Sequence, residues 1–281
     1  MRRRHPGGIE ILTGAELKQM RRAGLVVGRI LEEIGRNVHA GMTTAEVDAI
    51  AVDMLAQAGA TSNFLGYEPG YGVPPYPAVT CLSVNEEVVH GIPSGRVLKD
   101  GDLLSVDFGA IVAGYHGDGA RSFAIGTVEP LVTRLNEVTE ASMWAGIGAA
   151  RIAGTIADIS AAVERKIKLS GRYGIVHGYT GHGIGHRMHQ PPDIPNYRVP
   201  GHSPVIQPGM CLAIEPMVTL GRGHTDVLAD EWTVVTTDGS VGAHWENTIT
   251  VTQTGIWVLT EPDGGEAKLK ELGLPFGPLA D

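Results

Sequence analysis

The sequence predicts a single α+β domain made of two halves with the same order of elements. Helical patterning comes first and strand patterning follows, and this order occurs twice along the 281-residue chain. The repeat period of about 120 residues is too long for a solenoid, so it indicates an internal duplication with weak sequence identity. No low-complexity segment or linker separates the halves. We therefore expect pseudo-twofold halves that share one core.

The expected helices and strands follow from caps and apolar spacing. Thr13 precedes Glu16 by three residues, which is the capping-box pattern that opens a helix. A second helix begins at a cap on Thr43 or Thr44 and ends near Gly59. The expected elements are helices at 14–39, 44–58, 129–150 and 155–170, and strands at 103–108, 120–125, 210–219, 232–237 and 244–252. A loop at 66–77, rich in proline, glycine and tyrosine, is expected to run either on the surface or over a cleft.

The amino-acid composition argues against several classes of function. The chain can bury a sizeable core, is 43% hydrophobic and has a mean hydropathy of +0.03, which is typical of a soluble globular protein. A net charge of −9 argues against a nucleic-acid binder. No run of about 18 apolar residues exists that could span a membrane. The only cysteines, Cys81 and Cys211, provide no disulfide framework and fit a reducing cytosol.

The start of the chain resembles the beginning of a signal peptide but does not continue as one. The basic residues at 1–5 are followed by Pro6, two glycines and Glu10, where an apolar stretch should lie. We therefore expect no export.

Two aspartates stand in strand-like apolar sequence. Asp107 lies within LLSVDFG, where a buried carboxylate is costly unless a positive group compensates it. Asp118 lies between two glycines just before the next expected strand. If the chain reverses near 112–113, both carboxylates face one point. The alternative is a structural role, in which Asp107 caps a strand end or pairs with a basic residue such as Arg121.

The same pattern recurs at Glu215 and Glu246, each the single acid in an apolar strand-like segment. His182 lies nearby in the glycine-rich run GHGIGHRMHQPP. Several buried acids with few basic neighbours need a shared cation, and oxygen ligands with one imidazole suit Mn(II), Co(II), Fe(II) or Zn(II). Two ions could share bridging carboxylates. Such a site generates hydroxide near neutral pH and polarises a carbonyl, which favours amide hydrolysis.

Two further histidines, His90 and His189, remain as candidate catalytic groups. Histidine can shuttle a proton or donate to a developing oxyanion, although a lone histidine is also common as a structural residue. His90 stands in a turn context before Gly91 and Pro93. We interpret His186 and His202 as groups outside the ligand set.

Six motifs carry a resemblance to a known family: SVNEEVVHGIP at 83–93, VDFGA at 106–110, HGDGARSF at 116–123, GHGIG at 181–185, IEPM at 214–217 and WENTITVT at 245–252. Together they resemble the type I methionine aminopeptidases, which implies the pita-bread fold around a central curved sheet. The resemblance runs from about 10 to 255. We therefore expect an N-terminal tail at 1–9, a single catalytic domain at 10–255 and a C-terminal tail at 256–281.

The resemblance implies a role for each matching residue. It implies five ligands of a dinuclear site, with Asp118 and Glu246 bridging the ions: Asp107, Asp118, His182, Glu215 and Glu246. Glu215 is also the implied general base and proton shuttle. His90 matches the histidine near the scissile nitrogen, and His189 the one that stabilises the oxyanion, so both contact substrate.

The implied activity is removal of the initiator methionine from nascent proteins when the second residue is small. A hydroxide that bridges two divalent ions (Co, Mn, Fe, Zn or Ni) would attack the scissile carbonyl. The residues that match the methionine pocket are Tyr76, Cys81, Met188 and Trp232, for which ordinary core packing is the alternative. The expected partners are nascent polypeptides and, transiently, the ribosome. We expect a cytoplasmic monomer.

The chain departs from the family pattern in three places. Asn247 stands where many members have histidine, and Met188 where an aromatic residue is common. The loop at 68–75 looks longer than in compact members. Two rival functions remain open: a proline-specific peptidase on the same fold, which usually carries a large N-terminal domain, and a binding protein that has lost catalysis, which should lack one or more of the ligands.

Overall fold

A curved antiparallel sheet forms the centre of this computed structural model, which describes residues 3–4, 8–70 and 72–279. The strand order is β10-β9-β11-β16-β7-β6-β3, with β17 also paired to β16 and β4 to β6. These strands are β3 (Thr61–Ser62), β4 (Thr80–Val84), β6 (Leu103–Val112), β7 (Tyr115–Ala124), β9 (Gly181–Gly183), β10 (Gln190–Ile194), β11 (Cys211–Ile214), β16 (Glu246–Thr252) and β17 (Gly255–Val258).

Short strands form three smaller sheets around it. Their members are β1 (Arg3–Arg4), β2 (Glu10–Ile11), β5 (Glu87–Val89), β8 (Gly174–Ile175), β12 (Met217–Thr219), β13 (Thr225–Val227), β14 (Val234–Thr236) and β15 (Gly242–His244). The signal-peptide interpretation depends on the basic residues at 1–5. Of these, residues 1–2 and 5 lie outside the described part of the chain, and so do residues 6–7 of the expected N-terminal tail.

The helices are α1 (Gly14–Asn37), α2 (Thr44–Gln57), α3 (Pro130–Ala149), α4 (Ile156–Ser170) and the short α5 (Glu266–Glu271). The capping box of Thr13 and Glu16 is present at the start of α1. Thr43, rather than Thr44, caps α2. Each cap satisfies backbone N–H groups that the first helical turn leaves without a partner. Among the described residues, no helix is both long and apolar enough to cross a membrane.

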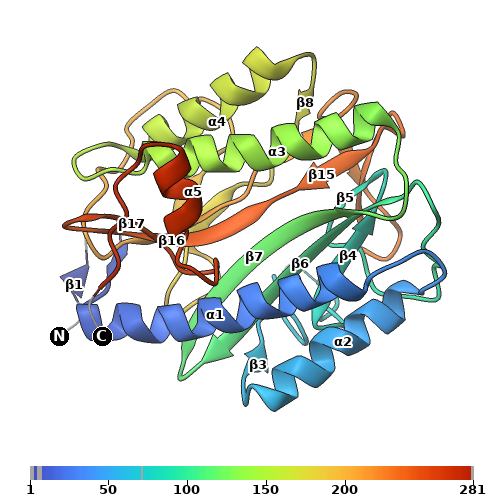
Figure 1. Cartoon of the computed structure of the whole chain (residues 1–281), viewed down its shortest axis with the longest axis horizontal. Coiled ribbons are helices and arrows are strands. Elements are labelled where there is room, and N and C mark those ends of the chain that lie inside the picture. Colours follow the sequence, from blue (N-terminus) through green and yellow to red (C-terminus); the bar gives the residue numbers. More distant parts are fainter. Residues whose placement is uncertain (1–2, 5–7, 71, 280–281) are drawn as a thin grey trace.

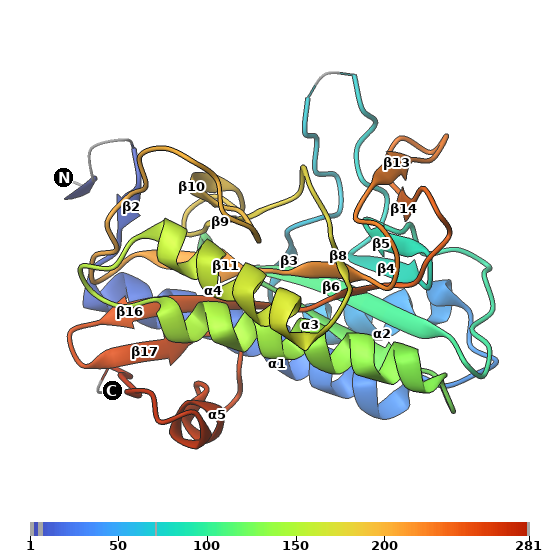
Figure 2. The ribbon, with the colours of Figure 1, turned by 90° about the horizontal axis from the view of Figure 1, so that it is seen from above.

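The two halves of the chain lie side by side in the sheet (Figure 1). Helices α1 and α2 pack with β4 and β6 around one apolar core, and α3 and α4 pack with β11, β16 and β17 around another. The halves join where β7 pairs with β16. Figure 2 shows α1, α2 and α3 on one side of the sheet, while β9, β10, β13, β14 and the loop segments 66–70 and 72–77 rise on the opposite side. The expected α+β arrangement of helices plus antiparallel strands is confirmed.

The β6–β7 hairpin is longer than expected, so Asp118 lies within a strand and not before one. The chain reverses at Ala113 and Gly114, both at positive φ. Gly117 and Gly119, which suggest a loop in the sequence, are strand residues in contact with α1. A Cβ atom on Gly117 would lie 2.8 Å from the backbone nitrogen of Gly24. Glycine is needed here for close packing of helix on strand.

The segment at 256–271 continues the fold beyond the expected catalytic domain, through β17 and α5. The guanidinium of Arg21, in α1, donates hydrogen bonds to the carbonyl oxygens of Leu259, Glu261 and Pro262. Gly24 approaches the same segment, because a Cβ atom on it would lie 2.2 Å from the carbonyl oxygen of Leu259. Helix α1 is thus held between β7 and the C-terminal segment.

The packing of Gly24 can be tested by substitution. Gly24→Ala should lower the free energy of unfolding by about 1–3 kcal/mol, because the new methyl group overlaps the Leu259 backbone. Gly14→Ala in the same helix is the control, since its Cβ would meet only Leu279 at 3.7 Å. The control should be neutral or slightly stabilising, by at most about 1 kcal/mol. Urea unfolding midpoints measure both, and equal midpoints would show that α1 can move away from the segment.

Candidate metal centre and active site

The register of the central strands brings three of the predicted ligands to one face of the sheet. Asp107 in β6 lies opposite Ala120 in β7, and Ala120 lies opposite Glu246 in β16. Residues directly opposite one another project to the same face, as do residues two apart along one strand. Asp118 precedes Ala120 by two residues, so its carboxylate shares this face.

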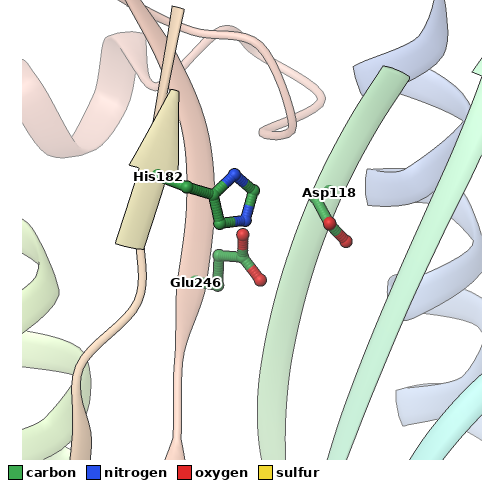
Figure 3. Close-up of side chains that lie close together, drawn as sticks. All are labelled: Asp118, His182 and Glu246. Atoms are coloured by element: carbon green, nitrogen blue, oxygen red, sulfur yellow. The ribbon is translucent and has the colours of Figure 1, made fainter. Parts of the chain in front are cut away.

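The other two predicted ligands reach the same face from the second half of the chain. His182 in β9 lies opposite Ala213 in β11, and Glu215 follows Ala213 by two residues, directly after the strand ends. Figure 3 shows the side chains of Asp118, His182 and Glu246 converging from three strands.

These side chains are buried, and several of their polar atoms have no partner. Asp118 is 3% exposed, His182 7% and Glu246 2%. Within the described chain, every fully buried side-chain nitrogen or oxygen that lacks a hydrogen-bond partner belongs to this cluster: Oδ1 of Asp107, Oδ1 of Asp118, Oε1 of Glu246 and both ring nitrogens of His244. Buried polar atoms are normally satisfied, so this concentration indicates a missing ligand.

Arg121 does not neutralise the cluster. Its guanidinium forms an ion pair with Glu261 and donates to the side-chain oxygen of Asn247 and the backbone oxygen of Glu246. The alternative of an Asp107–Arg121 pair is therefore wrong. Asn247, where many family members have histidine, donates to Glu261 and accepts from Thr260, so it belongs to the same network behind the sheet.

Burial and mutual repulsion shift the ionisation of the cluster. Burial raises the pKa of Asp107 well above its usual value, and the nearby Asp118 raises it further. Burial likewise raises the pKa of Asp118 to about 7 and the pKa values of Glu215 and Glu246 well above normal. Burial lowers the pKa of His182 to about 3, so its imidazole is neutral and can offer a lone pair.

The donor set fits divalent cations. Ligand atoms of Asp118, His182 and Glu246 lie within 4.8 Å of one another, and so do those of Glu215, His244 and Glu246. Carboxylate oxygens with imidazole nitrogen are ligands for Mn(II), Fe(II), Co(II), Ni(II) and Zn(II). A cation would satisfy the unpartnered oxygens and offset the cost of ionising several buried carboxyl groups together.

One cavity of about 210 Å³ adjoins the cluster. It brings together every site residue proposed from the sequence: the predicted ligands, both candidate catalytic histidines, and Tyr76, Cys81, Met188 and Trp232. These last four belong to one buried apolar cluster that also contains Phe64 and Ala78. These four side chains are buried and also line the cavity. The two interpretations, core packing and a methionine pocket, are therefore compatible.

The two candidate catalytic histidines face this cavity from loops at strand ends. His90 follows β5 at a φ of 60°, with its ring against Tyr179 and Trp232 at centroid distances of 5.6 and 6.1 Å. The ring of His189 lies 4.4 Å from that of His182, and its Nδ1 is 3.0 Å from the Tyr67 hydroxyl. Burial lowers the pKa of His90 to about 4.

Other cavity residues were not expected from the sequence. Phe64, Tyr67 and Pro69 line it, and His244 contacts the cluster from the side of Glu215. Tyr67 and Pro69 belong to the loop at 66–77, whose position over a cleft was one of two expectations. His244 precedes Glu246 by two residues, so the strand period was a signal that could have indicated it.

His186 and His202, interpreted from the sequence as groups outside the ligand set, do not line the cavity. His186 contacts Glu10 through its backbone N–H and its Nδ1, the latter at 2.8 Å, and thereby connects β2 to the glycine-rich run. His202 is exposed.

Comparison with known proteins identifies the family of this chain. Residues 18–253 match the description Metallopeptidase family M24. A methionine aminopeptidase of Clostridium acetobutylicum is 44% identical over 253 residues, which cover 90% of this chain and 98% of that protein. The chain belongs to the methionine aminopeptidases of metallopeptidase family M24. The resemblance drawn from the sequence motifs is thus confirmed.

Solved structures agree with this family and its pita-bread fold. The crystal structure of a methionine aminopeptidase from Thermotoga maritima matches with a TM-score of 0.84 and 37% identity, covering 90% of this chain and 99% of that one. A prolidase from Pyrococcus furiosus matches with a TM-score of 0.70 and 22% identity, and only 65% of its length is covered. At that identity the prolidase shows the shared fold alone.

The raised carboxyl pKa values predict how the cation-free protein responds to pH. Unfolded carboxyl groups lose their protons above about pH 4 whereas the buried ones retain them, so folding stability falls as pH rises toward the folded pKa. The buried histidines act in the opposite direction, but only below about pH 6.5. Between pH 6.5 and 8 the free energy of unfolding should therefore decrease, by up to about 1.4 kcal/mol per pH unit for each carboxyl still protonated.

Urea unfolding of chelator-treated protein measures this slope. Saturating Mn(II) should abolish the decline, and Asp107→Asn should reduce it, while the exposed-site variant His202→Ala keeps it. A flat profile in the chelated wild-type protein would contradict the coupling of these carboxyl groups.

Proposed function

We propose that this protein removes the N-terminal methionine of nascent polypeptides whose second residue is small, by metal-dependent hydrolysis. The observation that carries the proposal is the shared cavity, in which a cluster of unpartnered cation ligands adjoins an apolar pocket. The relatives indicate this activity, because proteins 44% and 43% identical to this chain are named methionine aminopeptidases.

Five side chains would hold two divalent cations: Asp107, Asp118, His182, Glu215 and Glu246. Asp118 and Glu246 are the residues that both cations would share, and Glu246 belongs to both groups of close ligand atoms. Bound there, the cations would supply Lewis-acid chemistry, which polarises a carbonyl group and lowers the pKa of water. Co(II), Mn(II), Fe(II), Zn(II) and Ni(II) all suit this donor set.

Groups that face the cavity carry out the acid–base catalysis in this proposal. The Glu215 side chain is 12% exposed, so one of its oxygens can meet water while the rest of the group is buried. It accepts a proton as water attacks and delivers it to the amine when the C–N bond breaks. His189 donates to the carbonyl oxygen as negative charge develops there, and His90 contacts the scissile nitrogen.

The apolar part of the cavity receives the methionine side chain. Tyr76 and Trp232 meet edge to face at a centroid distance of 5.0 Å, and Cys81 and Met188 complete this wall. Thioether sulfur packs favourably against aromatic rings, and the flexible Met188 can adapt to the substrate side chain. The register also favours this arrangement, because Cys81 lies opposite Asp107 and so joins the pocket to the ligand cluster.

The two rival functions are less well supported. A proline-specific peptidase is less favoured, because solved structures of that activity match at 20–24% identity, with about two thirds of their length covered. A protein that had lost catalysis should lack ligands, whereas all five are present beside both histidines. We further propose a cytoplasmic monomer that associates transiently with the ribosome.

Peptide hydrolysis tests the activity directly. Protein freed of metal and reloaded with each divalent cation should release methionine from Met-Ala-Ser. It should cleave a Leu-Ala-Ser peptide poorly, since the pocket fits an unbranched thioether side chain. An Xaa-Pro peptide is the control for the proline-specific rival. Preferential cleavage of the Xaa-Pro peptide would reject the proposal in favour of that rival.

Two substitutions separate catalysis from cation binding. His90→Ala should keep the metal content but reduce turnover of Met-Ala-Ser by about 10²- to 10⁴-fold, as for the loss of an acid–base or oxyanion contact. Asp118→Asn should lower the metal content itself, measured by elemental analysis after dialysis. His202→Ala serves as the surface control. Full turnover in His90→Ala would remove this residue from the mechanism, and two retained ions in Asp118→Asn would exclude its bridging role.

A further inference from the structure

His244 has no role in the mechanism above, yet it is among the most buried polar residues of the described chain. It ends β15, is 1% exposed, and neither of its ring nitrogens has a hydrogen-bond partner. Its backbone is fixed to β7, because its N–H donates to the Ser122 hydroxyl, which in turn donates to its carbonyl oxygen. A buried imidazole without a partner is costly unless a bound group or a small movement satisfies it.

The nearest charged partner of His244 is Glu215. Its Nε2 lies 3.7 Å from Oε2 of that carboxylate, slightly beyond hydrogen-bond distance. The other carboxylate oxygen, Oε1, lies 3.4 Å from Nε2 of His182. Each oxygen of the Glu215 carboxylate therefore faces a different imidazole.

The two imidazoles cannot have the same role. Nδ1 of His182 lies 3.1 Å from the carbonyl oxygen of Gly183, which is the partner that fixes its proton on Nδ1. The Nε2 lone pair of His182 is then available for a cation, and this nitrogen has no proton to donate to Glu215. His244 lacks such a constraint, so its Nε2 can carry the proton.

The surroundings of His244 allow the short approach that a hydrogen bond requires. A second cavity of about 280 Å³ adjoins the first, and His244 lines it together with His90, Tyr179, Glu215 and Met217. The ring therefore has free space on one side. A neutral imidazole has one N–H to donate.

We propose that His244 is a positioning residue, whose neutral imidazole donates an Nε2 hydrogen bond to Oε2 of Glu215 and holds that carboxylate in place. The inference rests on the proposed function, in which Glu215 is both a cation ligand and the proton shuttle. Fixing one oxygen by a donor selects which oxygen remains for the cation. Partners of this kind typically contribute 10- to 100-fold to metal affinity or activity.

Two substitutions at His244 test the donor role. Glutamine places an amide N–H at a reach similar to that of Nε2 but is a poor cation ligand, whereas leucine fills similar space with no donor. His244→Gln should keep Mn(II) affinity and turnover of Met-Ala-Ser within about threefold, whereas His244→Leu should lose about 10- to 100-fold in affinity. Calorimetric titration of the metal-free proteins with Mn(II) measures the affinity, and His202→Leu is the exposed-site control.

Each result decides the question. If His244→Gln and His244→Leu lose affinity equally, the imidazole itself ligates the cation and the donor role is wrong. If both bind like the wild-type protein, His244 serves packing alone, and the proposal is again overturned. Should His244→Leu fail to fold by circular dichroism, His244→Met replaces it as the variant without a donor. The titration does not depend on substrate, so a wild-type protein inactive on Met-Ala-Ser would reject the proposed function and leave this test intact.

Discussion

The concentration of negative charge on one face of the central sheet is the constraint that explains most of this structure. Four carboxyl groups and one imidazole project into the same small volume, and one buried oxygen each of Asp107, Asp118 and Glu246 has no hydrogen-bond partner. Bringing these groups together is unfavourable in the absence of cations, because burial and repulsion both oppose ionisation. The fold therefore has to supply the free energy that keeps them close. The extended β6–β7 pairing and the close contact of α1 with β7 are the elements that do so.

The site lies where the two halves of the chain join. One hairpin contributes Asp107 and Asp118, and the other half contributes His182, Glu215 and Glu246. Strand β16 pairs with β7, so the two groups of ligands meet at the junction between the halves. Residues on the opposite side of this junction form a rigid support, since Arg121 connects β7, the backbone of Glu246 and the C-terminal segment. Small displacements of either half would change the distances between ligands.

Much of this arrangement could be predicted because it follows from local rules. The threonine caps fixed the start of α1 and α2, and acids within apolar strands indicated a shared cation. The predicted length of β6 and β7 was too short, since Gly117 and Gly119 resemble loop residues until the helix that packs on them is known. His244 was missed for a related reason. Its spacing of two residues from Glu246 was a usable signal, but only the fold shows that its Nε2 lies 3.7 Å from Oε2 of Glu215.

The loop at 66–77 is anchored at its base. Backbone hydrogen bonds join Gly66 and Tyr67 to Tyr76, and the indole of Trp232 donates to the carbonyl oxygen of Pro74. The residues that line the cavity are thus held independently of the length of the loop beyond them. An inhibitor that extends from the cavity toward this loop would therefore meet Tyr67 and Pro69 as an anchored wall beside the ligand cluster.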